Sequence, residues 1–579
     1  MFFIVAEQVQ VQRRVLWASL FLLVLLTIAI LPVAAADPPN ASFSGTPTTG
    51  TLPFTVSFSD LSSNSPTGWA WFFGDENWAL PAWTQTKANI VDANNWSARY
   101  WHSSVAMPDG SIVLMGGYTS GPTLYNDTWR STNNGTTWKL MNTSAGWEAR
   151  LAHSSVAMPD GSIILMGGSN DPSGSGTEFN DTWRSTDSGT TWTNVTVSAG
   201  WTARDSHSSV AMPDGSIVLM GGFDGGYKND TWQSTNNGET WTQVNGSGGW
   251  TARYGHTSVA MPDGSIVLMG GYATDGIKND TWRSTDNGAT WTQMTASAVW
   301  AARHYHSSVA MPDGSIVLMG GNAYETVDLY KNDTWRSTDN GATWTQVNES
   351  AGWTARNCHS SVAMPDGSIV LMGGYDDSGN NKNDVWRFVP TGSSAQNPLH
   401  TYTTAGVFQV ALQAFNTGGY NSTRKAGYIT VTGLPAPVAS FTANVTSGTA
   451  PLPVSFTDSS TNTPTGWAWF FGDENFTVPW TQMKPNDGAG WSARNGHSSV
   501  SMPDGSIVLM GGYDESTQKN DVWRSTDNGS TWTQQTAGAG WSVRGYHSSV
   551  SMPDGSIVLM GGYDESTYYN LNSAELGAS

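Results

Sequence analysis

Histidine and arginine, which could transfer protons or bind anions, recur at fixed places in this 579-residue sequence. The phrase "HSSVAMPDGSIVLMGG" or a near copy begins at His102, His153, His207, His256, His306 and His359. An arginine stands just before each, at Arg99, Arg150, Arg204, Arg253, Arg303 and Arg356. A ring of arginines could bind carboxylates, and imidazoles could act as acids or bases. Because each occurs once per repeat in equivalent surroundings, we expect a structural role, in packing and hydrogen bonding, for both sets.

Residues outside the repeat pattern offer little other chemistry. His304 and His306 would lie on one side of a strand and could hold a metal with a third ligand. We favour the alternative, one repeat histidine beside one exposed variable residue. Cys358 is the only cysteine and excludes an internal disulfide framework. Zinc-protease, serine-hydrolase and phosphate-loop motifs are absent from the sequence, so we expect no catalytic residue, no metal and no cofactor.

Each repeat predicts four antiparallel strands, which must position any site. "ARxxHSSVAM" is predicted as the first strand, ending at the "PDG" turn. The apolar run "SIVLMGG" is predicted as a second strand that is buried on both faces. "NDTWRS" and "TWTQ" follow as the third and fourth strands, joined by an Asn-Gly turn that favours tight hairpins. Successive repeats begin 49 to 54 residues apart, a period typical of propeller blades.

The first and fourth strands each occur six times before residue 390, but the two sets are offset along the chain. "WTQ" at Trp83 precedes the first complete blade, whereas the last repeat stops at "NDVWRFVP" without a fourth strand. We therefore expect the Trp83 strand to close the sixth blade and to join the two ends of the ring. The sequence predicts a six-bladed β-propeller over residues 79–390.

Two further sets of residues carry a resemblance to known propellers. Gly116-Gly117 after the second strand, residues 126–129 in the third and Trp138 in the fourth resemble the kelch repeat. The pattern Ser-x-Asp-x-Gly-x-x-Trp at residues 284–291 and 337–344 resembles the Asp-box of sialidase-type propellers, which is a structural turn in that family. Sialidases also use three arginines, a Tyr/Glu nucleophile pair and an Asp acid. No such asymmetric set stands out here, so a sialidase-like glycosidase is an alternative rather than the expectation.

The stretches that flank the propeller resemble the two halves of a PKD domain, an Ig-like β-sandwich. "PTGWAWFFGDEN" ends the first half and "NPLHTYTTAG" begins the second, which places Asp75 and His400, close together in the family, 325 residues apart. Glu76 stands where the family usually has Gly, a departure that is tolerable if the chain leaves the turn there. Because loop tips tolerate insertions, we expect residues 37–78 and 391–434 to form one sandwich around an inserted propeller.

The same unit then begins again. Residues 435–476 repeat the first sandwich half, and residues 477–579 contain two further blades, with repeat histidines at His497 and His547. Two blades cannot bury their faces without neighbours. We therefore expect an incomplete second propeller and a truncated second copy.

Variable loops follow the second strand of every blade. In an antiparallel blade these loops and the blade-to-blade connections emerge on one face, and the near-constant "PDG" and Asn-Gly turns on the other. Loops of diverse length on a rigid scaffold are common recognition sites, and aromatic rings suit sugar stacking. The candidate ligand-binding residues are Tyr118, Tyr125, Phe179, Phe223, Tyr227, Tyr272, Tyr324, Tyr330 and Tyr375.

Composition and the N-terminal sequence limit the possible functions of the chain. Charged residues make up 12% of the chain and the net charge is −20, which argues against nucleic-acid binding. Arg13 and Arg14, an apolar run from Val15 to Leu31 and small residues up to Ala36 predict a secretory signal over residues 1–36, with an uncleaved anchor helix as the alternative. Asn-x-Ser/Thr sequons are frequent, as expected of an exported and glycosylated chain.

These patterns predict a non-enzymatic binding or adhesion protein of the cell exterior or cell surface. We expect the variable propeller face to recognise an extracellular glycan or a surface protein. A sialidase-like glycosidase and a structural cell-envelope component are the alternatives, and membrane contact is expected only through an uncleaved N-terminal segment. The arrangement is similar to that of PKD-containing surface proteins of archaea and bacteria.

Overall fold

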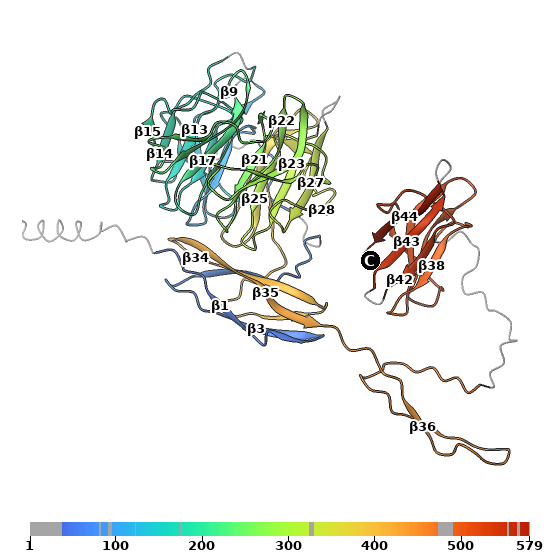
Figure 1. Ribbon diagram of the computed structural model, residues 1–579. Coiled ribbons are helices and arrows are strands. Elements are labelled where there is room, and N and C mark those ends of the chain that lie inside the picture. The colour runs from blue at the N-terminus through green and yellow to red at the C-terminus, as the bar shows by residue number, and fades with distance from the viewer. Residues whose placement is uncertain are drawn as a thin grey trace, which may run out of the picture. The chain divides into compact units, whose positions relative to one another are not determined.

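The computed structural model shows an all-β protein (Figure 1). It describes residues 37–79, 83–90, 95–121, 123–173, 176–323, 329–472, 490–552, 555–563 and 568–577. The predicted signal, residues 1–36, lies outside the described residues. Every regular element in these ranges is a β-strand, which confirms the predicted all-β class. The chain divides into two compact units, Met1–Ser440 and Phe441–Ser579.

Six antiparallel sheets form most of the first unit. From the inner to the outer strand, blades 1 and 2 are β6 (Ser103–Ala106), β7 (Ile112–Met115), β10 (Thr128–Ser131) and β11 (Lys139–Asn142); then β12 (Ser154–Ala157), β13 (Ile163–Met166), β14 (Thr182–Ser185) and β15 (Thr193–Thr196). Blades 3 and 4 are β16 (Ser208–Ala211), β17 (Ile217–Phe223), β18 (Tyr227–Ser234) and β19 (Thr242–Asn245); then β20 (Arg253–Tyr254) and β21 (Thr257–Ala260), β22 (Ile266–Ala273), β23 (Gly276–Ser284) and β24 (Thr292–Thr295). Blades 5 and 6 are β25 (Ser307–Ala310), β26 (Ile316–Asn322), β27 (Tyr330–Ser337) and β28 (Thr345–Asn348); then β29 (Arg356–Asn357) and β30 (Ser360–Ala363), β31 (Ile369–Asp376), β32 (Asn381–Phe388) and β5 (Thr84–Lys87). A short hairpin, β8 (Tyr118–Thr119) and β9 (Thr123–Leu124), extends from blade 1.

The six sheets form a closed ring. The inner strands contact one another in the cycle β6, β12, β16, β21, β25, β30 and back to β6. In the last sheet the outer strand, β5, comes from the N-terminal end of the ring and pairs with β32, with Trp386 opposite Gln85. The two ends of the propeller therefore share one sheet.

Apolar second strands hold neighbouring blades together. Between blades 3 and 4, Val218 and Met220 of β17 pack with Ile266 and Leu268 of β22 against the buried Trp250. The glycine pair that follows the four apolar residues of each second strand leaves room for the repeat histidine. At Gly271, whose φ is +101°, a Cβ would lie 2.7 Å from the Cβ of His256, so no larger residue fits there.

The predicted first strand is wrong at its start. It does not run unbroken from the repeat arginine, because a residue of positive φ separates that arginine from the inner strand; Tyr305, for example, has a φ of +52°. The inner strands begin after the histidine, at Ser307 in blade 5. Strand periodicity therefore stops between the arginine and the histidine, and the residues there turn toward one mouth of the ring.

A two-sheet sandwich joins the chain before the propeller to the chain after it. One sheet contains β1 (Phe43–Thr46), β3 (Phe54–Asp60) and β33 (Leu399–Tyr402); the other contains β2 (Thr49–Thr51), β35 (Gly419–Thr432), β34 (Gly406–Asn416) and β4 (Gly68–Phe72). Both sheets thus mix strands from the two flanking stretches. His400 Nε2 lies 2.9 Å from both carboxylate oxygens of Asp75, and Tyr402 donates to the carbonyl of Phe73 at 3.1 Å.

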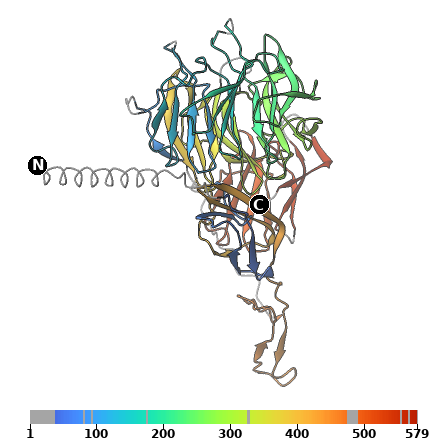
Figure 2. The same ribbon diagram turned by 90° about the vertical axis from the view of Figure 1, so that its left-hand side faces the viewer.

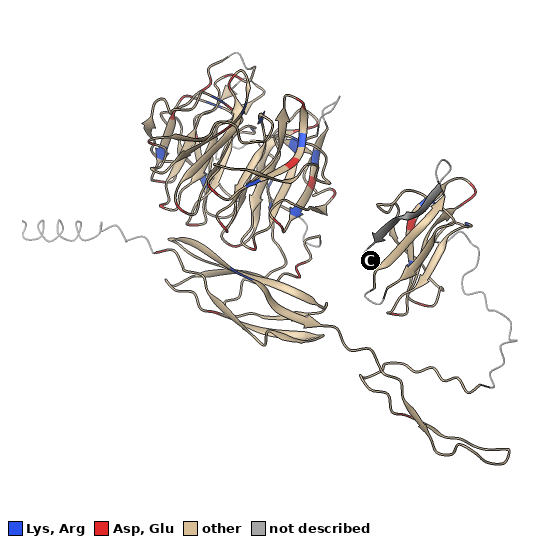
Figure 3. Ribbon diagram, viewed as in Figure 1, with Lys and Arg blue, Asp and Glu red and all other residues tan. Residues whose placement is uncertain are grey.

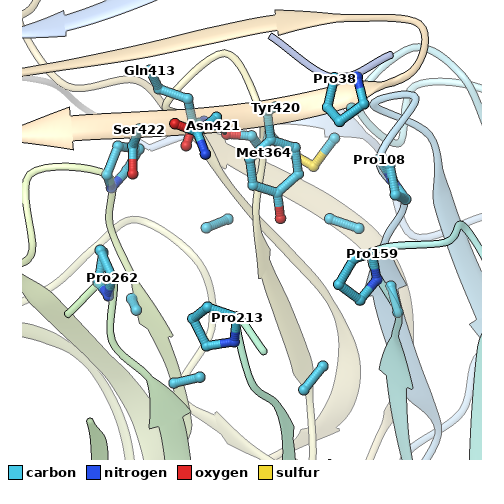
Figure 4. Close-up of a pocket in the computed structure, with 18 of the residues that line it drawn as sticks. Pro38, Pro108, Pro159, Pro213, Pro262, Met364, Gln413, Tyr420, Asn421 and Ser422 are labelled. Carbon is cyan, nitrogen blue, oxygen red and sulfur yellow. Dashed lines mark hydrogen bonds between the residues drawn. The ribbon is translucent and has the colours of Figure 1, made fainter. Parts of the chain in front are cut away.

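The sandwich covers the face of the propeller that carries the "PDG" turns (Figures 1 and 2). The amide of Gln413, on β34, donates to the carbonyl of Pro365 at 2.7 Å, and that of Gln409 donates to Asp313 O at 2.7 Å. A chamber of about 490 Å³ remains between them, lined by the Ala-Met-Pro stretches of the turns. Figure 4 shows Tyr420, at the start of β35, directed into this chamber among the prolines. The sandwich therefore covers this end of the ring.

The second unit repeats the pieces of the first. Its strands are β36 (Phe441–Ala443) and β37 (Phe456–Asp458); β38 (Ser498–Ser501), β39 (Ile507–Tyr513), β40 (Gln518–Ser525) and β41 (Thr533–Thr536); and β42 (Ser548–Ser551), β43 (Ile557–Tyr563) and β44 (Tyr568–Gly577). The inner strands β38 and β42 contact each other. The described part of this unit therefore contains one short hairpin and two adjacent blade-like sheets.

Candidate binding face

The propeller face opposite the sandwich is the candidate site, and we call it the upper face. It carries the variable loops after the second strands and the connections between blades. Charged residues are sparse over the propeller (Figure 3), and Lys228, Lys278 and Lys382 of this face each form an ion pair with an aspartate. Any selectivity of this face must therefore come from particular side chains rather than from a broad charged patch.

The repeat arginines do not offer free guanidinium groups. All six are fully buried, and each binds the aspartate that follows the repeat asparagine in the third-strand segment of its own blade. In blade 4, Arg253 donates to both carboxylate oxygens of Asp280, at 2.6 and 2.8 Å, and to the carbonyl of Gly270 at 2.8 Å. The equivalent Nη1–Oδ1 distances in the six blades run from 2.5 to 2.7 Å. These arginines link the strands of each blade, and none of them faces a ligand.

The repeat histidines are also internal. In five of the six blades, Nε2 of the histidine bonds the first hydroxyl residue of the preceding inner strand, as His306 does with Thr257 Oγ1 at 2.8 Å. Burial, together with the nearby arginine, lowers the pKa of His102 to about 3. These imidazoles are neutral near pH 7 and connect neighbouring blades around the ring.

A circle of backbone hydrogen bonds surrounds the upper mouth of the ring. It is formed by the positive-φ residues that stand directly before the repeat histidines. Each donates its N–H to the carbonyl of the equivalent residue in the previous blade, at 2.7–3.0 Å. The members are Trp101, Ala152, Ser206, Gly255, Tyr305 and Cys358. These hydrogen bonds give the mouth the same backbone in every blade. The blades therefore differ at the mouth only in their side chains.

Tyr305 and Trp101 make this mouth asymmetric. The Tyr305 ring lies over Gly255, where an added Cβ would come within 3.1 Å of it, and its hydroxyl reaches Ser206 Oγ at 3.3 Å. The Trp101 ring packs edge-on against Tyr305 with centroids 5.7 Å apart. Two large rings therefore cover a mouth that is sixfold in its backbone.

The aromatic rings of the upper face form a continuous band. Tyr254 is the centre on one side, with ring centroids 5.4 Å from Tyr227, 5.5 Å from Tyr272 and 5.8 Å from Phe223. Tyr254 also contacts Tyr305 at 5.9 Å, which connects this group to the mouth.

On the other side of the mouth, Tyr100 continues the band. Its ring lies 4.7 Å from Trp101, 5.0 Å from Tyr375 and 5.4 Å from Tyr118. Tyr375 in turn contacts Tyr330 at 6.4 Å. We define the aromatic band as Tyr100, Trp101, Tyr118, Phe223, Tyr227, Tyr254, Tyr272, Tyr305, Tyr330 and Tyr375.

Not all of the predicted ligand-binding residues lie in this band. Tyr125 and Phe179 instead cover the buried arginines of their blades, with the guanidinium carbon of Arg99 3.7 Å from the Tyr125 ring centre and that of Arg150 4.1 Å from Phe179. Their geometry is that of cation–π contacts inside a blade. Tyr324 lies outside the described residues.

The prediction missed four residues of the band: Tyr100, Trp101, Tyr254 and Tyr305. They occupy the two variable positions of the phrase "ARxxH", which reads RYWH, RLAH, RDSH, RYGH, RHYH and RNCH along the ring. These are variable positions inside a nearly constant phrase, and that contrast was the signal in the sequence. His304, taken as an exposed variable residue, is instead buried against Tyr272. Among the described residues, no three His, Cys, Asp or Glu side chains are placed to hold a metal.

A cavity of about 260 Å³ lies beside the mouth. Trp101, Phe223, Tyr227, Tyr254 and Tyr305 line it together with Asp171, Pro172, Ser173, Asp205 and Ser206, and with Leu151 and Ala152. Burial raises the pKa of Asp205 to about 6, with a further contribution from the charge of Glu178. The cavity therefore combines aromatic walls with a partly desolvated carboxylate.

This geometry defines the class of protein: a β-propeller with one face closed by a sandwich and the other carrying an aromatic band and a cavity. Residues 112–386 match the Attractin/LZTR1 beta-propeller family. The chain thus contains a kelch-type β-propeller. A comparison with curated proteins finds no match. In the part of the chain that the structure describes, no helix has the length and apolar character needed to cross a bilayer.

Proposed function

We propose that this protein is a non-enzymatic binding protein of the cell exterior, whose upper propeller face recognises a protein or glycan partner. The observation that carries the proposal is the aromatic band. On a scaffold that repeats the same backbone six times, large rings collect at the mouth and beside one cavity, although nothing in the repeat requires them there. The rings of the band are half-buried, and partly exposed aromatic groups next to a cavity are typical of recognition surfaces.

The match to a kelch-type propeller family supports the binding role, because membership of such a family suggests that the propeller interacts with other proteins. Export rests on the sequence alone, on Arg13, Arg14 and the apolar run that ends near Ala36. In this proposal the sandwich, a PKD-type domain by resemblance, holds the opposite face and directs the upper face outward.

A sialidase-like glycosidase has less support. Such enzymes bind the substrate carboxylate with free arginines, whereas Arg99, Arg150 and the other repeat arginines are each bound to an aspartate of the same blade. Nor does a specific observation favour a purely structural envelope component, which would not need a localised aromatic band.

The experiment compares the full chain with two variants. Tyr254→Ser removes the centre of the band, and Tyr420→Ser, on the opposite face, is the matched control. Binding is measured on a glycan array and by capture of surface proteins after cross-linking. We expect Tyr254→Ser to lose at least tenfold in binding and Tyr420→Ser to retain it. Equal loss in both variants, or turnover of a sialoside by the wild-type chain, would contradict the proposal.

A further inference from the structure

The cavity beside the mouth contains a carboxylate without a basic partner. Three aspartates of the variable loops on this face do have one: Asp224 lies 2.7 Å from Lys228 Nζ, Asp275 lies 2.7 Å from Lys278 Nζ, and Asp376 pairs with Lys382. The repeat aspartates, such as Asp230, are bound by arginine. Among the described residues no Lys or Arg forms an ion pair with Asp205. Its side chain is half-buried, and the lining of the cavity contains no basic residue.

The walls of the cavity favour a cation over other ligands. Tyr254 and Tyr305 contact each other beside Asp205, and Trp101 packs against Tyr305. The faces of such rings attract ammonium and guanidinium groups, most strongly where water is excluded. A buried carboxylate adds to this, because an opposite charge compensates its lost hydration. An anion would meet Asp205 and Glu178 without any basic group in the lining, and is disfavoured.

The size of the cavity narrows the ligand further. About 260 Å³ is below the usual range of roughly 300–1,000 Å³ for sites of drug-sized ligands. It suits a single head group with a few methylenes, which is the shape of a lysine or arginine side chain. The lining also contains the polar side chains of Asp171, Ser173 and Ser206, which could hydrogen-bond the backbone of an incoming segment.

We infer that the Asp205 cavity receives a lysine or arginine side chain presented by a protein partner. The inference rests on the proposed function and specifies the chemistry of the same face. The basic head group lies against Trp101, Tyr254 and Tyr305 and forms its ion pair with Asp205. A glycan partner would use the aromatic band without needing this carboxylate.

The test uses the full chain and three small probes: Nα-acetyl-lysine N-methylamide, Nα-acetyl-arginine N-methylamide and the neutral Nα-acetyl-norleucine N-methylamide. Binding is measured by ligand-detected NMR at low ionic strength, where charge pairing is least screened. We expect saturable binding of a basic probe at least tenfold tighter than that of the neutral probe. Asp205→Asn should abolish this preference. Asp275→Asn, which removes a carboxylate of the same face outside the cavity, should leave the affinity within twofold.

Each outcome decides the inference. Equal binding of the neutral probe, absence of saturable binding, or an unchanged preference in Asp205→Asn would overturn it. Binding of a methyl glycoside that is insensitive to Asp205→Asn would also overturn it, in favour of a glycan. If the basic probes fail while Tyr254→Ser still abolishes partner capture, the proposed function stands and only the inference falls. Near-ultraviolet circular dichroism of Asp205→Asn confirms that the variant is folded.

Discussion

The Asp280→Asn variant tests whether the buried Arg–Asp pairs hold the blades together. The Asp280 carboxylate accepts hydrogen bonds from both terminal nitrogens of Arg253, at 2.6 and 2.8 Å, and from the Trp282 indole at 2.8 Å. The Arg253 side chain is 0% exposed. Asparagine keeps the volume of the side chain but removes its charge, which leaves a buried guanidinium without a counter-ion. Removing one partner of a buried pair costs about 3–5 kcal/mol.

Amide hydrogen exchange of the full chain, followed by mass spectrometry, locates this loss. A decrease of 3–5 kcal/mol in the free energy of opening corresponds to exchange that is roughly 150 to 5,000 times faster. We expect this change in peptides of β22 and β23, with smaller effects in blades 3 and 5 and none in blade 1, which lies three positions away on the opposite side of the ring.

Two further variants make the result specific. Arg283→Met breaks a pair with Asp263 at 2.8 Å in which both side chains are over a quarter exposed; such a pair contributes about 1 kcal/mol or less. The double variant Arg253→Met, Asp280→Leu replaces the buried pair with apolar groups and should recover most of the lost protection. If Asp280→Asn accelerates exchange no more than Arg283→Met does, the reasoning is wrong.

Three other predictions concern stability. Below pH 6.5 the protein should lose stability, because histidines of the unfolded chain gain a proton near that pH whereas burial holds the pKa of His102 at about 3. Each such histidine lowers the free energy of unfolding by about 1.4 kcal/mol at pH 5.5. A urea midpoint that does not fall from pH 7 to pH 5.5 would contradict this prediction. Asp205, which faces Glu178, Tyr254 and Tyr305, has a pKa raised from 3.8 to about 6, so folding favours its protonated form and its contribution to stability falls as the pH rises between these values. Asp205→Asn should therefore stabilise the protein at pH 8, by at most about 3 kcal/mol, with the gain shrinking toward pH 4 in urea titrations; a gain that is the same at both pH values would refute the assignment. Gln413→Ala removes the 2.7 Å bond to Pro365 and should cost about 1–2 kcal/mol, whereas an unchanged urea midpoint would show that the sandwich does not stabilise the propeller.

The repeat made the propeller fold predictable from the sequence, because turn residues, apolar runs and tryptophans recur at one period. The all-β class and the kelch-type propeller are confirmed. The same periodicity prevented the central residues of the candidate site from being predicted. Tyr254 and Tyr305 follow the repeat arginine inside what reads as a strand, and the positive φ before each histidine, as at Tyr305, turns this segment toward the mouth.

Side-chain contacts explain why two of the predicted site residues lie elsewhere. Tyr125 and Phe179 end the variable loops of their blades, as Tyr330 of the band does in blade 5, yet each stacks on the arginine of its own blade. A pattern of residue types shows which loops vary. It cannot show whether an aromatic ring turns outward or covers a buried ion pair, because that depends on which side chains pack against the arginine in the folded blade.

The order in which the sandwich strands are made has a consequence for synthesis. Phe73 is 3% exposed once Tyr402 of β33 and Val410 of β34 pack around it, but those strands follow only after the whole propeller; Asp75 and His400 are 325 residues apart. At roughly 5–20 residues per second the first half waits about 16–65 s for its partner strands. The second copy shows what such a half presents on its own, since Phe471 and Trp469, the counterparts of Phe73 and Trp71, are 59% and 36% exposed. During each round of translation these aromatic side chains are therefore exposed to other chains until the strands that follow the propeller have been made.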